Sequence, residues 1–179
     1  MKRCVISIVA LAILLCCMTV ICSCSENALI SDPFEYTEGS FAAKIEGCVE
    51  EFCFCAKVTS AYGGDGGGRK ITVVFSAPQS LSGMTVTVDG EKMKARLDSI
   101  VADEWNAVAL PVLIEALCQR RTPQTVRAVG GGMLEVKVCD KNCNIEYLFD
   151  EGNGIPVKIS GKAEGDSFLF TITDFEVLK

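Results

Sequence analysis

Cysteine is the residue type with the widest chemical reach in this chain, which has 11 cysteines and no histidine. Without histidine there is no imidazole ligand for a metal, and neither a Ser-His nor a Cys-His pair can activate a nucleophile. Acid–base catalysis would have to come from Asp and Glu, and none of these clusters around a recognisable nucleophile. The sequence therefore predicts a protein that is not an enzyme and that uses no metal or cofactor.

The first cysteines lie in an apolar N-terminal segment. Lys2 and Arg3 precede an uncharged run over residues 4–25 that includes VISIVALAILL. A positive start followed by an apolar run is typical of an export signal. The run is also long enough to span a bilayer, which takes about 20 residues, so an uncleaved anchor and secretion in soluble form remain alternatives.

The stretch VICSCS, residues 20–25, favours cleavage and lipid attachment. Ile21, two small residues and Cys24 resemble the lipobox of bacterial lipoproteins, in which a peptidase cuts just before a cysteine whose thiol carries a diacylglycerol. Cys22 fits this pattern less well, because the bulky Ile21 would precede the cut. The resemblance implies a signal peptide over residues 1–23 and lipidation of Cys24. An exported protein would then be anchored to the outer face of the cell membrane, since two or more acyl chains suffice for stable anchoring.

Residues 24–39 carry four acidic side chains and no basic one, without helical or strand periodicity. This composition predicts that the segment is an acidic tether between the lipidated cysteine and one globular domain over residues 40–179.

Six cysteines fall within residues 40–179, namely Cys48, Cys53, Cys55, Cys118, Cys139 and Cys143. Cys48 and Cys53 share the polar face of a predicted hairpin near its turn, which makes them a candidate disulfide in an oxidising compartment. Cys53 and Cys55 lie on one face of the same strand, in an arrangement too rigidly splayed for a zinc knuckle.

Alternating apolar and polar residues predict strands through most of residues 40–179. Hairpin turns are expected at Glu50-Glu51, at Asp89-Gly90 and at Lys141-Asn142, the last placing Leu134, Val136 and Val138 opposite Phe149, Tyr147 and Ile145. So many strands exceed what a flat open sheet holds. The predicted fold is mainly β (α+β), a strongly curved antiparallel sheet or half-barrel of eight to ten strands with one or two short helices as lid or plug.

One segment interrupts the strands. Residues 105–114 carry no charge, Pro111 suits the first turn of a helix, and apolar side chains follow at helical spacing at Leu110, Leu113, Ala116 and Leu117. This helix either plugs the concave face and completes the core or forms a lid over a cavity for an apolar ligand.

Three stretches resemble LolA-like and LppX-like lipoproteins: APQSLSGMTVTVDG at 77–90, LPVLIEALCQ at 110–119 and FDEGNGIPVKIS at 149–160. The resemblance covers roughly residues 40–179. It implies a half-open antiparallel barrel closed by short helices, whose concave face binds acyl chains or lipidated cargo.

The charge of the chain excludes some partners. The formal net charge is −6, which disfavours nucleic acid. The glycine-rich stretch 62–70 lacks the Lys-Ser/Thr pair of a phosphate-binding loop and is interpreted as a hairpin connection.

Two function classes remain. The first is a lipoprotein that binds a lipid, acyl chain or other hydrophobic ligand in its concave face, lined by Phe41, Ile45, Phe54, Phe75, Val86 and Leu113. The second is a structural or protein-interaction lipoprotein of the cell envelope with a filled core and no ligand. The sequence identifies no protein partner.

Overall fold

A computed structural model describes residues 32–62, 68–90, 92–103, 109–163 and 165–178. The signal peptide expected at 1–23 and the lipidation expected at Cys24 lie outside the described residues. The part from Asp32 to Lys179 is one compact unit. No described helix is long and apolar enough to cross a membrane.

The described residues form one antiparallel sheet of eleven strands and one α-helix, with two short 3-10 helices, η1 (Glu35–Glu38) and η2 (Gln79–Leu81). The first six strands are β1 (Ser40–Val49), β2 (Phe52–Tyr62), β3 (Arg69–Ala77), β4 (Thr85–Asp89), β5 (Lys92–Leu97) and β6 (Ile100–Asp103). After the helix α2 (Ala109–Cys118) come β7 (Thr125–Gly130), β8 (Met133–Asp140), β9 (Cys143–Asp150), β10 (Pro156–Ala163) and β11 (Asp166–Leu178).

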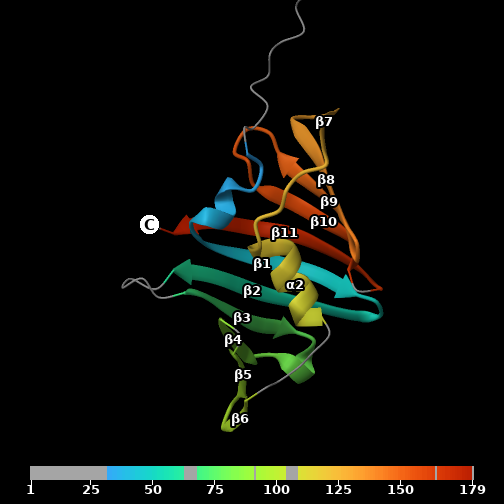
Figure 1. The fold of residues 1–179 in the computed structure, drawn as a ribbon. Coiled ribbons are helices and arrows are strands. Elements are labelled where there is room, and N and C mark those ends of the chain that lie inside the picture. The colour runs from blue at the N-terminus through green and yellow to red at the C-terminus, as the bar shows by residue number, and fades with distance from the viewer. Residues whose placement is uncertain (1–31, 63–67, 91, 104–108, 164, 179) are drawn as a thin grey trace, which may run out of the picture. The chain divides into compact units, whose positions relative to one another are not determined.

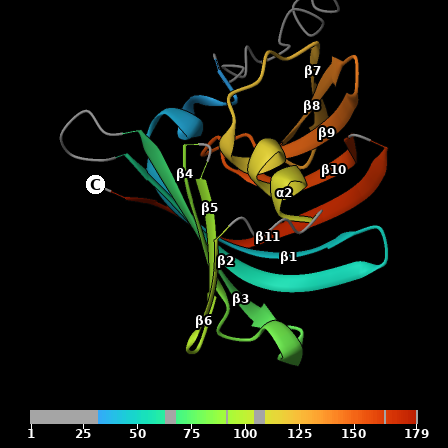
Figure 2. The ribbon, with the colours of Figure 1, turned by 60° about the horizontal axis from the view of Figure 1, so that its bottom comes forward.

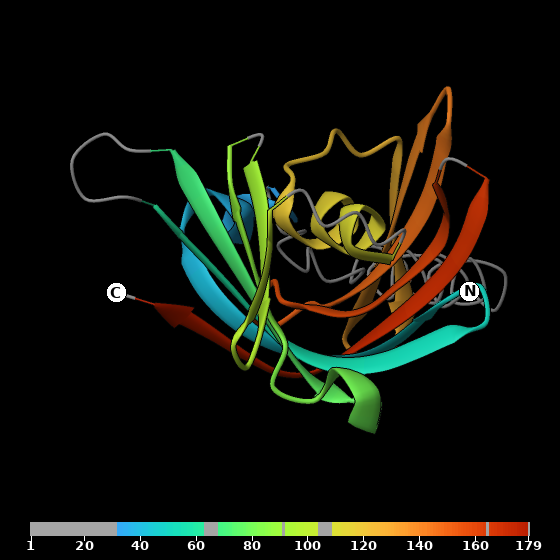
Figure 3. The same ribbon diagram turned by 90° about the horizontal axis from the view of Figure 1, so that it is seen from below.

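The strand order is β6-β5-β4-β3-β2-β1-β11-β10-β9-β8-β7. Two meanders, β1–β6 and β7–β11, are therefore joined in the middle by pairing of the first strand with the last (Figure 1). Within the described part of the chain, β6 and β7 are the two edge strands, so this sheet curves but does not close (Figure 2). Seen from below, the sheet curves around α2, which lies in its hollow (Figure 3).

The predicted mainly β, curved antiparallel architecture is confirmed, but the expected number of eight to ten strands is too low. The additional strands are at the edges. β6 has only four residues, and every residue of β7 is exposed, so neither shows the alternation of burial by which strands are recognised.

The hairpin registers follow the apolar pattern of the sequence. Leu134 pairs with Phe149, Val136 with Tyr147 and Val138 with Ile145, as predicted. A register shifted by one residue would turn these buried side chains toward solvent, which is why the pattern specifies the pairing so strongly.

The structure differs from the expected tether in its second half. Phe34 is fully buried, with its ring centroid 4.9 Å from that of Tyr147 and 5.7 Å from that of Phe149. The hydroxyl of Thr37 donates a 2.7 Å hydrogen bond to the Phe34 carbonyl. Residues 32–39 thus belong to the domain, because one buried aromatic ring outweighs the exposed charges around it.

Candidate ligand-binding site

The helix α2 is fixed in the hollow at its C-terminal end. The last carbonyls of a helix have no partner within it. Here the hydroxyl of Tyr147 donates to the Ala116 carbonyl at 2.9 Å, and that of Tyr36 to the Leu117 carbonyl at 2.9 Å. The Arg69 guanidinium donates to the carbonyl of Cys118.

The apolar face of α2 completes the core. Leu110, Leu113, Ala116 and Leu117, the four residues predicted at helical spacing, are all buried. The helix thus occupies the position of a plug in this structure, and its separation from the sheet would expose these side chains to water.

The six predicted lining residues come from both β1–β4 and α2, and all are buried in the core. No more than 3% of the surface of any of them is exposed; they are Phe41, Ile45, Phe54, Phe75, Val86 and Leu113. The concave face is therefore filled at these positions.

A cavity of about 600 Å³ lies at one end of the concave side, and we call it the helix cleft. Its volume is within the range of about 300–1,000 Å³ that is usual for small-molecule sites. Its walls come from η1, from β2–β4 and from the C-terminal half of α2. The lining residues are Thr37, Glu38, Tyr62, Arg69, Ile71, Val88, Gly90, Ile114, Cys118, Gln119 and Arg120.

Arg69 is the most unusual group in the helix cleft. Its Nε donates to the Ser60 hydroxyl at 2.5 Å, and its guanidinium carbon lies 5.7 Å from the ring centre of Phe41 and 5.4 Å from that of Tyr62. Its Nη2 is buried and has no hydrogen-bond partner among the described residues. A buried N–H group without a partner costs free energy, which an acceptor on a ligand would recover.

The other arginines beside the helix cleft are paired with carboxylates. Arg120 pairs with Glu38 and Asp32, and Arg121 with Glu115. No ion pair between Arg69 and a described carboxylate is seen. Burial raises the pKa of Cys118 to about 12 and raises the pKa of Tyr36 well above its ordinary value, so both neighbours stay neutral at physiological pH.

Sequence reasoning missed the helix cleft and considered Arg69 only as part of the glycine-rich connection. One signal was available, since Arg69 has the same parity as the buried Ile71, Val73 and Phe75 on β3 and so must face inward. The cleft itself is formed by the ends of separate elements, and no local pattern predicts that.

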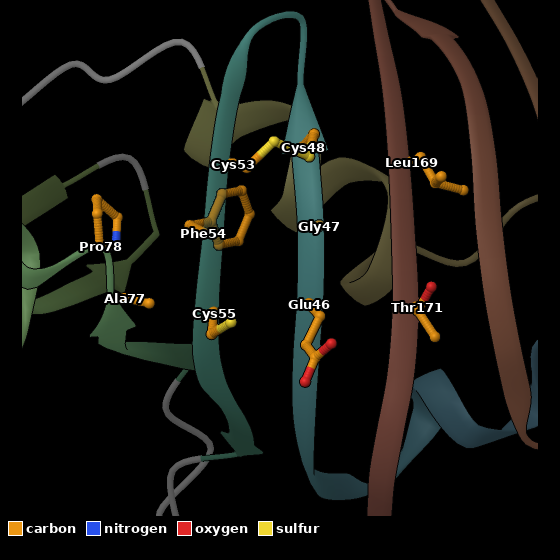
Figure 4. Close-up of a pocket in the computed structure, with 10 residues that line it drawn as sticks. All are labelled: Glu46, Gly47, Cys48, Cys53, Phe54, Cys55, Ala77, Pro78, Leu169 and Thr171. Carbon is orange, nitrogen blue, oxygen red and sulfur yellow. A yellow bond between two sulfur atoms is a disulfide. The ribbon is translucent and has the colours of Figure 1, made fainter.

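A second cavity, of about 430 Å³, lies on the convex face of the sheet, and we call it the convex pocket (Figure 4). The structure joins Cys48 and Cys53 by a disulfide across β1 and β2, in the wall of this pocket. Cys55 is a free thiol in the same wall. The described residues contain no group of three or more potential metal-ligating side chains of the Cys, His, Asp or Glu type.

No family model and no curated protein matches the sequence. An uncharacterized conserved protein from Thermus thermophilus matches the structure with a TM-score of 0.52 and 12% identity over 82% of this chain and 83% of that one. MucB matches with a TM-score of 0.50 and 12% identity over 82% of this chain, which spans only 56% of the MucB chain.

The Mycobacterium tuberculosis lipoprotein LppX also matches, with a TM-score of 0.45 and 12% identity over 86% of this chain and 96% of that one. At such identities the matches concern the fold alone. The fold shared with the Thermus thermophilus protein is a curved, unclosed antiparallel sheet around a helix, and LppX, one of the lipoproteins that the sequence motifs resemble, is among the matches.

Proposed function

We propose that this protein is an exported lipoprotein, anchored to the outer face of the cell membrane through a lipidated Cys24, that binds an acyl-chain ligand with an anionic head group. The proposed site is the helix cleft and not the filled centre of the concave face. The observation that supports it is a ligand-sized cavity lined by Arg69, whose Nη2 is buried and has no hydrogen-bond partner among the described residues. No catalytic step is part of this proposal.

The lining of the helix cleft suits the two ends of such a ligand. Ile71, Val88 and Ile114 offer apolar surface to methylene groups, each of which gains about 0.8 kcal/mol on burial. Arg69 offers N–H groups to a carboxylate or phosphate, and hydrogen bonds to charged groups are stronger than those between neutral groups.

Ligand binding is tested by native mass spectrometry of the purified protein mixed with palmitate or with hexadecanol. We expect one palmitate per chain and at least about tenfold weaker retention of hexadecanol, because the alcohol cannot form the charge-assisted hydrogen bonds. Replacing Ile114 by tryptophan should fill the cleft and lower palmitate retention by about tenfold or more.

The matched control is Ile100→Trp, since Ile100 is 70% exposed and lies outside the cleft. It should leave retention unchanged. Equal retention by the Ile114 and Ile100 variants would place any bound palmitate elsewhere, and a single ligand-free mass for the unmodified sequence would exclude lipid binding.

Lipidation has its own test. Cys24→Ser should abolish incorporation of a labelled fatty acid and leave the signal peptide uncleaved, because the thiol that carries the lipid is lost. Cys22→Ser is the matched control and should remain labelled and membrane-bound. A Cys24→Ser protein that is still labelled would contradict the assignment of the lipidated residue.

The alternative is a structural or protein-interaction lipoprotein with no ligand. The burial of all six predicted lining residues favours this alternative, because the centre of the concave face is already filled by side chains and excludes water without a ligand. Absence of fatty-acid and phospholipid uptake in the experiment above would support this second candidate.

A further inference from the structure

The convex pocket combines a disulfide, a free thiol and apolar surface on the side of the sheet that faces away from α2. Cys48 lies directly opposite Cys53 in the β1–β2 register, and Cys55 lies two residues further along β2 on the same face. Figure 4 shows the bridge between the two strands, with Cys55 and Glu46 further along them and Leu169 on β11. We propose that the convex pocket is a thiol–disulfide exchange site for an external thiol with apolar neighbours.

The disulfide is not placed where a bridge stabilises a fold most. It closes a ring between residues only five positions apart, across a hairpin that the two-residue turn Glu50-Glu51 already holds in register. The effect of a disulfide on the unfolded chain grows with the length of the ring, so a short ring constrains it least.

The bridge is also open to attack. Cys53 is exposed and Cys48 is half-buried, so an external thiolate reaches the Cys53 sulfur more readily. Exposed disulfides are the ones that exchange, whereas structural bridges in secreted proteins resist reduction.

The rest of the convex pocket indicates what carries the incoming thiol. Ala77, Pro78 and the 43% exposed Leu169 provide apolar surface beside the sulfur atoms. Glu46 lies opposite Cys55 in the register and lines the same pocket, so its carboxylate repels an acidic neighbour of the thiol. The matching partner is a thiol flanked by apolar groups, either a small molecule or a cysteine in an extended peptide.

Exchange requires two successive attacks by external thiolates. An external thiolate attacks the Cys53 sulfur, a new S–S bond forms between them, and the bond to Cys48 breaks, so Cys48 leaves as a thiolate that takes a proton from water. A second external thiolate then attacks the external sulfur, releasing an external disulfide and the Cys53 thiolate. Two external thiols are oxidised to one disulfide, and the Cys48–Cys53 bridge is reduced to two thiols.

Cys55 provides a second thiol to which the external sulfur can be transferred. It lies roughly 7 Å from Cys53 along the strand, so a sulfur held on Cys53 is close to its thiol. Attack by the Cys55 thiolate on that external sulfur transfers it to Cys55 and frees Cys53 as a thiolate, with no bond between Cys53 and Cys55.

The experiment uses the folded, oxidised protein and three probes: free cysteine, a peptide with leucines beside one cysteine, and the same peptide with aspartates in their place. Free thiols are alkylated with N-ethylmaleimide after timed intervals, and mass spectrometry locates the adducts. We expect adducts on Cys53 and Cys55, alkylation of the released Cys48, and about tenfold faster reaction of the leucine peptide than of the aspartate peptide.

Two variants sharpen the result. Cys55→Ser should keep the adduct on Cys53 alone, and Cys139→Ser, which removes an exposed free thiol elsewhere, should change neither rate nor site. If the leucine peptide reacts faster than free cysteine, the site is one for polypeptide thiols. If the leucine peptide and free cysteine react at equal rates, the site is one for small thiols. A bridge that stays intact with all three probes, or adducts confined to Cys139, would overturn the proposal.

A stability measurement separates exchange from a structural role. The Cys48→Ser, Cys53→Ser double variant should stay folded and lose no more than about 10 °C in Tm. If that variant is unfolded at room temperature, the bridge is structural and the exchange proposal fails.

Discussion

Replacing Gly161 by alanine should lower the free energy of unfolding by about 3 kcal/mol, because the sheet leaves no room for a side chain there. Gly161 lies on β10 between Ile145 of β9 and Phe168 of β11. A Cβ atom at this position would be 2.1 Å from the Asn144 carbonyl oxygen and 2.9 Å from the Ile145 Cα. Both are backbone atoms, so the strands themselves would have to move apart. Urea denaturation followed by circular dichroism measures the effect.

The matched control is Gly39→Ala. Gly39 has no atom within 4 Å of a Cβ built on it, and its φ of −97° is one that alanine adopts without strain. The free energy of unfolding of the Gly39→Ala variant should differ from that of the unmodified protein by no more than about 0.5 kcal/mol. Equal effects of the two substitutions would show that the close approach of β9 and β10 at Gly161 is absent in solution.

Leu113→Ala should cost about 3 kcal/mol of stability and should lower the stability of the whole domain in a single transition. Leu113 lies in the middle of α2 and has 0% exposure, so the substitution leaves a cavity between helix and sheet. Urea denaturation measures the change, and Ile100→Ala is the control. Ile100 is an aliphatic residue that is already 70% exposed, so its truncation should cost no more than about 0.5 kcal/mol.

The Leu113 variant also distinguishes a plug from a lid. A plug is part of the core, so its destabilisation should increase amide hydrogen exchange in the sheet as well as in α2. A lid that opens independently would show faster exchange in α2 alone, with the urea midpoint of the sheet unchanged. The second pattern would contradict the structural role that the buried face of α2 indicates.

The helix cleft lies beside the core, so ligand binding and stability depend on different residues of α2. Ile114 lines the cleft and is only partly buried, whereas Leu113, the preceding residue, is fully buried. Substitutions at these two neighbouring residues should therefore affect ligand binding and stability separately. A variant at Ile114 should alter uptake of palmitate with little effect on the urea midpoint, and a variant at Leu113 should do the reverse.

Much of the sheet could be predicted from the sequence, because local apolar patterns specify it. The register of Leu134, Val136 and Val138 against β9 follows from alternation and a short turn, as does the β1–β2 hairpin at Glu50-Glu51. The helix α2 was predicted from its apolar spacing and from Pro111 in its first turn. In each case the residues that decide the element lie close together in the chain.

Other features depend on contacts between distant residues. β7 is exposed along its whole length and is a strand only because β8 pairs with it. Phe34 is buried because Tyr147 and Phe149, more than a hundred positions away, form its pocket. Neither contact leaves a pattern in the neighbouring sequence.

The sequence by itself determined the curved antiparallel sheet, its central hairpins and the helix, since these arise from periodicities of two and 3.6 residues within single segments. The tertiary structure alone decided that the predicted lining residues are filled core and that Arg69 lines a cleft, with one buried N–H group that has no partner among the described residues. The physical reason is that a cavity is bounded by the ends of several elements, and its existence depends on how closely those elements approach one another after they have packed.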